Sequence, residues 1–153
     1  MEMHSESFKF DDTIPALYSC EGRNRSPQLS WSDPPTGTQS FVLIVDDPDA
    51  PSGTFAHWGV YDIPAGMTHL DEGLTRHDAE AAGVRQVLND MGHIGYDGPC
   101  PPRGHGIHHY QFRLFALDVP HLELPSRANC RELEQAAGPH ILGRARLTGT
   151  YKR

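Results

Sequence analysis

Side chains with the chemistry of a binding or catalytic site occur at the ends of three apolar segments. An acidic turn, Asp46 to Pro51, follows the apolar run at 41–45. His57 and the pair His108 and Tyr110 occupy similar places in two later segments. Carboxylates at the end of a buried strand cost free energy unless something pairs with them or binds there. The sequence therefore predicts a rigid polar pocket at one edge of the core.

Three kinds of chemistry fit these side chains. Two histidines and a carboxylate can hold zinc or non-haem iron, although the chain has no HxH or HExxH spacing. Cys100 could act as a nucleophile, but its surroundings give no cue for a lowered thiol pKa. In an anion pocket, His57 and His108 would donate hydrogen bonds to phosphate-like oxygens, while Asp47 orients a histidine. The Gly- and Pro-rich loop at 92–106 would add backbone N–H groups. The residues alone leave all three possibilities open.

Short strands separated by turns must position these groups. Alternating or continuous apolar residues predict strands around Phe8 and Phe10 and at 29–31, 41–45, 54–63, 108–117 and 145–151. Asn129 to Glu132 has the pattern of a capping box and predicts a short helix that ends at Gly138-Pro139. The segment 69–91 has weak periodicity, which predicts a loop with little regular structure.

Strand alternation indicates which side chains share a face. Asp47 continues the face of Phe41, Leu43 and Val45, and His108 and Tyr110 continue the face of Phe112 and Leu114. Simple alternation puts His57 with Phe55, Gly59, Tyr61 and Ile63. If the three strands are neighbours, Asp47, His57, His108 and Tyr110 converge. We further expect Asp49 to shape the turn and the rim of the pocket, and Asp46 to face solvent.

Length and composition predict a single domain over residues 1–153. The net charge of −7 argues against nucleic acid or anionic membrane surfaces as main partners. Three widely spaced cysteines favour free thiols over a Cys20–Cys100 bridge, and the first six residues lack the pattern of a signal peptide. We therefore expect a cytoplasmic protein without stable membrane insertion. The histidines that we expect to be solvated surface residues are His4, His69, His77, His93, His121 and His140.

Two long motifs resemble the phosphatidylethanolamine-binding protein (PEBP) family, in particular its bacterial and archaeal branch, often labelled Raf-kinase-inhibitor-like. They are Asp47-Pro48-Asp49-Ala50-Pro51-Ser52 with Ala56-His57-Trp58, and the segment from Gly98 to Tyr110. The resemblance runs nearly end to end, from Ile14-Pro15 to Gly149-Thr150-Tyr151.

The resemblance implies an all-β-dominated fold, an antiparallel Greek-key β-sandwich with one or two short helices. It also implies cis peptide bonds in the acidic turn, a possible homodimer, and no cofactor or metal. The family pocket maps onto Asp47, Asp49, His57, Cys100, Pro102, His108 and Tyr110.

By resemblance, this pocket takes phosphate, phospholipid head groups, acetate and similar anions. The expected function is therefore binding rather than enzymatic turnover, with possible modulation of a kinase or protease. The alternative is a metal-dependent or cysteine-dependent hydrolase that uses the same pocket. Two departures from the family pattern are Gly59, expected to loosen the packing behind His57, and Asp97, expected to weaken anion affinity.

Overall fold

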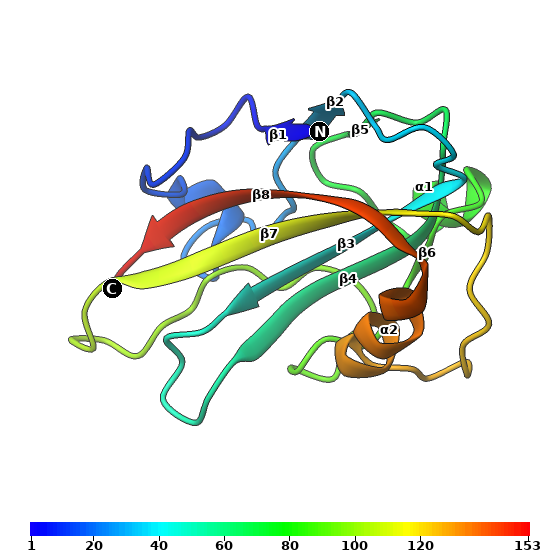
Figure 1. Cartoon of the computed structure of the whole chain (residues 1–153). Helices are drawn as coiled ribbons and strands as arrows, with labels where there is room; N and C mark the ends of the chain where they lie inside the picture. Colours follow the sequence, from blue (N-terminus) through cyan, green and yellow to red (C-terminus); the bar gives the residue numbers. More distant parts are fainter.

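The computed structural model describes residues 1–153 and consists of two antiparallel β-sheets with short helices (Figure 1). The larger sheet has five strands in the order β6-β4-β3-β7-β8, and the smaller has three in the order β1-β2-β5. The strands are β1 (Glu2–His4), β2 (Leu29–Ser32), β3 (Ser40–Asp47), β4 (Phe55–Pro64), β5 (His69–Leu70), β6 (Arg85–Gln86), β7 (His108–Leu117) and β8 (Ile141–Tyr151). The helices are η1 (Ala16–Tyr18), α1 (Arg76–Ala81), α2 (Cys130–Ala137) and η2 (Gly138–His140). The mostly-β prediction is confirmed, and Greek-key closure into a sandwich stays a prediction.

Strand β3 is the centre of the larger sheet and is buried on both faces. Its Phe41, Leu43 and Val45 belong to the apolar cluster that joins the larger sheet to the smaller one, where Trp31 of β2 meets Phe41 edge-on. Its opposite face packs with α2. A strand covered on both faces needs apolar residues at consecutive positions, which explains the unbroken run at 41–45.

Two sequence-based predictions of local structure are wrong. No strand forms around Phe8 and Phe10, because Phe8 packs singly into the core while Phe10 is exposed. The segment 69–91 contains β5, α1 and β6, which are too short to show a period. A signal for α1 is nevertheless present: the side chain of Thr75 caps it by accepting a hydrogen bond from the Asp78 backbone N–H.

Strand β4 carries two register shifts against β3, and these change which of its side chains share a face. Trp58, paired with Val45, and Val60, paired with Leu43, both face the larger apolar cluster. Gly59 and Tyr61 therefore face the α2 side, and the prediction that they share the face of His57 is wrong. A β-bulge inserts one residue into a strand and so resets the alternation beyond it.

Packing at Gly59 is tight rather than loose. A Cβ atom added there would lie 2.5 Å from Val87 Cγ2 and 2.9 Å from Cys130 Sγ. The expectation that Gly59 loosens the structure behind His57 is therefore wrong. The glycine is what allows α2 and the loop that follows β6 to approach the sheet.

Cys20 and Cys100 form a disulfide across 80 residues of sequence, and only Cys130 is a free thiol. This corrects the expectation of three free thiols. The bridge ties the segment after η1 to the loop before β7, where the Cys20 backbone N–H also donates to the Pro99 carbonyl. Every peptide bond is trans, so the expected cis bonds at Asp47-Pro48 and Ala50-Pro51 are also a wrong prediction.

Replacing Gly59 with alanine should lower the free energy of unfolding by roughly 1–3 kcal/mol, because the added methyl overpacks this contact. Gly66→Ala is the matched control, since a Cβ there meets no atom within 4 Å. Urea unfolding of both variants measures the difference. Equal stabilities would contradict the tight packing of α2 on β4.

Thiol titration should find one reactive cysteine in protein purified and unfolded without reductant, and three after reduction. In the folded protein the remaining thiol should react slowly, because burial raises the pKa of Cys130 to about 12 and leaves it 3% exposed. Cys130→Ser should leave no thiol before reduction. Three thiols in the unreduced, unfolded protein would contradict the disulfide.

Candidate functional site

A cavity of about 270 Å³ lies where β3, β4 and β7 bring their polar ends together. Since β4-β3-β7 are adjacent strands, the expected convergence of Asp47, His57, His108 and Tyr110 is confirmed. Cys100 and Pro102 also line the cavity, whereas Asp49 does not. The remaining lining residues are Ala50, Pro51, Phe55, Met91 and Pro101.

A buried carboxylate–histidine pair lies in one wall of the cavity and is joined to an exposed histidine outside the lining. Asp47 Oδ2 and His108 Nδ1 are 2.6 Å apart, and the two side chains are only 4% and 2% exposed. Asp47 Oδ1 also accepts from the Asp49 backbone N–H, so the carboxylate has partners on both oxygens. Beyond this pair, His108 Nε2 lies 2.6 Å from Nδ1 of His105.

His105 is a site residue that the sequence reasoning missed. Its only signal was the spacing His105-x-x-His108, which leads from the loop into the first residue of β7.

His57 and Tyr110 form a second wall, with their rings edge to face and centroids 5.3 Å apart. His57 Nδ1 lies 2.7 Å from the Asp97 carbonyl, so this nitrogen carries the hydrogen and Nε2 is the acceptor of the neutral ring. Burial lowers the pKa of His57 and so favours that neutral form. The buried Tyr110 hydroxyl lies near Asp47 but has no hydrogen-bond partner at normal distance and angle. Burial, followed by the charge of Asp47, raises the pKa of Tyr110, which keeps the hydroxyl protonated and able to donate.

Asp97 holds His57 in place from outside the cavity. Its carboxylate accepts hydrogen bonds from the side-chain amides of Asn24 and Asn89 and lies 2.7 Å from His93 Nδ1. These hydrogen bonds outweigh the effect of burial and lower the pKa of Asp97. The anchored Asp97 side chain therefore helps to fix the Asp97 carbonyl that His57 Nδ1 contacts. The effect of Asp97 on anion affinity stays a prediction.

The other two carboxylates of the acidic turn have separate surroundings. Asp49 lies in the turn outside the cavity lining, where its Oδ2 accepts from the backbone N–H of His109 and is 2.7 Å from His109 Nδ1. The hydrogen bond to the His109 side chain is the main reason that the pKa of Asp49 is lowered. Its role in ligand binding stays a prediction, while its place in the turn is as expected.

Asp46 does not face solvent, which corrects the sequence-based expectation. It is buried on the α2 face of the sheet, 2.6 Å from Arg113 Nη2. Arg113 also pairs with Glu134 of α2 at 2.8 Å. Burial raises the pKa of Asp46 even though Arg113 opposes that shift. Alternation along β3 puts Asp46 on the opposite face from Asp47, and that opposite face is covered by the helix.

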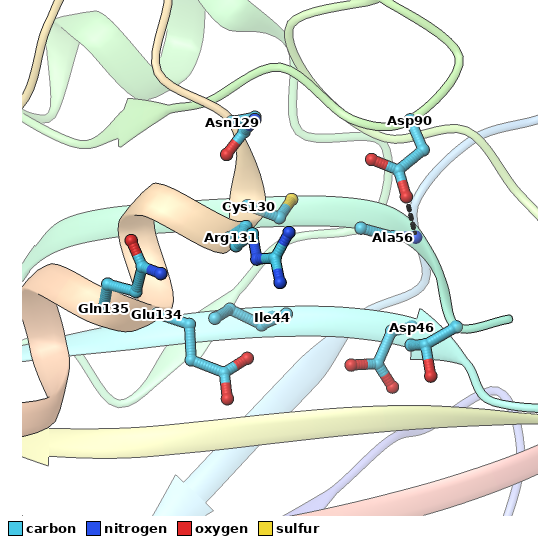
Figure 2. A pocket seen from close by; sticks show the side chains of 10 residues that line it. Ile44, Asp46, Ala56, Asp90, Asn129, Cys130, Arg131, Glu134 and Gln135 are labelled. Carbon is cyan, nitrogen blue, oxygen red and sulfur yellow. Dashed lines mark hydrogen bonds between the residues drawn. The ribbon is translucent and has the colours of Figure 1, made fainter.

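A larger, shallower groove of about 790 Å³ lies beside Asp46, between α2 and the ends of β3 and β4 (Figure 2). Asp90 borders it and accepts a hydrogen bond from the Ala56 backbone N–H, and Arg131 and Gln135 project from the helix. Three carboxylates that line this groove already have partners: Asp46 and Glu134 bind Arg113, and Asp90 binds the Ala56 backbone. The Arg113 Nε beside this groove has no partner, and in the smaller cavity the buried Tyr110 hydroxyl has none.

The cavity has donors and acceptors for a small polar ligand but no charged Lys or Arg side chain in its lining. Side chains of His, Cys, Asp and Glu do not form a group of three or more arranged to hold a metal ion. Cys100 is joined to Cys20, so its sulfur is not a thiolate nucleophile in this state. Neither α-helix has the length and apolar character needed to cross a membrane.

Comparison with known proteins gives a consistent family. The family model described as phosphatidylethanolamine-binding protein matches residues 4–152. A UPF0098 protein of Aquifex aeolicus is 50% identical over 153 residues, which are 100% of this chain and 89% of that protein. LppC of Mycobacterium tuberculosis, whose name describes it as a lipoprotein, is 43% identical over 139 residues, covering 91% of this chain and 66% of LppC.

The fold comparison agrees. The crystal structure of Escherichia coli YbcL, described as a new member of the mammalian PEBP family, matches with a TM-score of 0.93 and 33% identity, covering 99% of this chain and 98% of YbcL. The chain belongs to the phosphatidylethanolamine-binding protein family.

Proposed function

We propose that this protein binds a small phosphate-like or carboxylate anion, such as a phospholipid head group, in the cavity formed by Asp47, His57, His108 and Tyr110. The observation that carries the proposal is the buried Tyr110 hydroxyl, which lies in a cavity and has no hydrogen-bond partner. A buried donor without a partner costs about 1–3 kcal/mol, and a ligand oxygen would remove that cost.

The positive charge that holds an anion has to come from a histidine, because neither Lys nor Arg lines the cavity. His57 is a poor source, since burial lowers its pKa and favours the neutral ring. His108 is the better source, because a ligand that accepts from its Nε2 while Asp47 Oδ2 accepts from its Nδ1 requires a hydrogen on both ring nitrogens. Binding of an anion is therefore coupled to the uptake of one proton.

Binding rather than turnover is the proposed mode of action. A cysteine-dependent hydrolase would need the Cys100 thiol, which is part of the disulfide. The cavity lining also contains no Ser or Thr, so it lacks the pairing of a nucleophilic side chain with a base that covalent hydrolases use. No observation in the site favours the hydrolase alternative.

The proposal extends to a protein partner, a kinase or protease that ligand occupancy would modulate, and to a homodimer in the cytoplasm. The disulfide removes one ground for the cytoplasmic location, since it replaces two of the three expected free thiols. The name of LppC points to a different location for that relative. Fractionation of the source cells with an antibody to the protein tests the location directly.

Sulfate affinity should rise as the pH falls from 8 to 6, by up to about tenfold per unit, because the complex holds one proton more than the free protein. Calorimetry with sulfate measures this cleanly, since its charge is constant over that range. Phosphate, whose own charge changes, is the comparison ligand.

His108→Gln should abolish the pH dependence, whereas His140→Gln should preserve it, because His140 pairs with Asp118 away from the cavity. Equal sulfate affinities at pH 6 and pH 8 in the unmodified protein would contradict the proton uptake.

Tyr110→Phe should weaken sulfate binding by roughly 10-fold to 150-fold, the value of a hydrogen bond to a charged oxygen. It should not lower the free energy of unfolding, because the hydroxyl has no partner in the free protein. Tyr61→Phe, on the opposite side of the sheet, should leave the affinity unchanged. Calorimetry and urea unfolding of both variants separate the two effects, and unchanged affinity in Tyr110→Phe would exclude the hydroxyl as a ligand.

A further inference from the structure

We propose that the imidazole of His105 occupies the anion subsite of the ligand-free protein, and that an anion binds by displacing it from His108. The inference rests on the proposed function and adds a residue and an order of events to it. Its basis is the distance of 2.6 Å between His105 Nδ1 and His108 Nε2, with the ring centroids 4.9 Å apart.

The direction of the hydrogen bonds explains why His105 and an anion exclude each other. Both oxygens of Asp47 accept, so His108 Nδ1 is the donor to Oδ2. In the neutral ring, His108 Nε2 then carries no hydrogen and accepts a hydrogen bond donated by His105 Nδ1. A bound anion needs the reverse polarity at the same nitrogen, an N–H that donates. His105 must therefore leave before His108 can turn a donor toward the ligand.

His105 is placed so that it can leave at low cost. It is exposed, and Gly104 and Gly106 on either side have φ values of +75° and +95°. A Cβ added at either glycine would meet no atom within 4 Å, so the two glycines are not packed against another segment. The backbone is held here by hydrogen bonds from the Gly104 and His105 N–H groups to the Arg153 and Pro102 carbonyls, which a rotation of the His105 side chain leaves intact. The contact with His108 is the single hydrogen bond of the His105 side chain.

The remainder of the cavity is held independently of His105. Cys100 is fixed by the disulfide, and the neighbouring Pro101 carbonyl accepts from Arg153 Nε at 2.7 Å. His57 and Tyr110 belong to strands β4 and β7. Movement of the glycine-flanked histidine therefore opens the subsite on His108 without rebuilding the pocket.

Displacement makes the site selective for ligands that compete with an imidazole donor. A neutral alcohol or amide would form with His108 a hydrogen bond no stronger than the one that His105 already forms, so it leaves His105 in place. An anionic oxygen gains a charge-assisted hydrogen bond and replaces it. The hydrogen bond lost with His105 has the net strength of a neutral pair, so it lowers anion affinity by roughly threefold to tenfold.

Calorimetric titration of sulfate into His105→Ala tests the displacement. We expect binding that is roughly threefold to tenfold tighter than in the unmodified protein. Ile107→Ala is the control for loosening of the same exposed loop and should bind as the unmodified protein does. Adding His108→Gln to His105→Ala should remove the gain. Equal or weaker binding in His105→Ala would overturn the displacement while leaving the proposed function intact.

A second measurement does not depend on affinity. In protein with ¹⁵N-labelled histidine, the NMR spectrum of the free state should show His105 as the Nδ1–H tautomer, and sulfate should convert His108 to the doubly protonated form and release His105. A free state without the Nδ1–H tautomer of His105 would overturn the inference. If sulfate and phosphate bind to none of the variants, the proposed function fails, and the displacement fails with it.

Discussion

The buried pair of Asp47 and His108 is the interaction on which the site depends. Strand β3 ends at Asp47 and the adjacent strand β7 begins at His108, and both side chains are almost fully buried. Removing one partner of such a pair leaves a buried polar group uncompensated, which typically costs about 3–5 kcal/mol. The acidic turn after β3 therefore cannot move away from the start of β7. This constraint fixes the direction of the His108 ring, and hence the nitrogen that is offered to His105 or to a ligand.

Strand β4 pairs with β3 irregularly, through two shifts of register. A regular strand would place Gly59 and Tyr61 on the same face as His57, away from α2. The register shift between Val45 and Asp46 lets His57 reach the cavity while Gly59 turns toward the helix. Close approach of α2 on one face and the position of the histidine on the other thus have the same structural origin. Bulges next to functional sites commonly redirect a side chain in this way.

The loop before β7 supplies the remainder of the wall, and its conformation is defined by contacts between distant segments. The disulfide fixes Cys100 against Cys20, and the hydrogen bonds of Asp97 fix the carbonyl that orients His57. Between this anchored part and β7 lies the glycine-flanked His105. In the proposed displacement, this wall stays in place while the His105 imidazole leaves His108, so the anion would be recognised by an exchange of hydrogen-bond partners rather than by a fixed positive charge.

The sequence by itself determined the strands at β2, β3, β4, β7 and β8, the capping box of α2, and the group of Asp47, His57, His108 and Tyr110 at the strand ends. Alternation and local motifs suffice for the strands and the helix cap because these depend on neighbours in the chain. The convergence of the four polar side chains also required β4, β3 and β7 to be adjacent in the sheet, which at the level of sequence was only a condition. Only the tertiary structure decided the disulfide, the burial of Asp46 with Arg113, the tight contact at Gly59 and the bond of His105 to His108. Each of these depends on which distant segment packs nearby, and on bulges that shift the register, and neither leaves a periodic signal in the sequence.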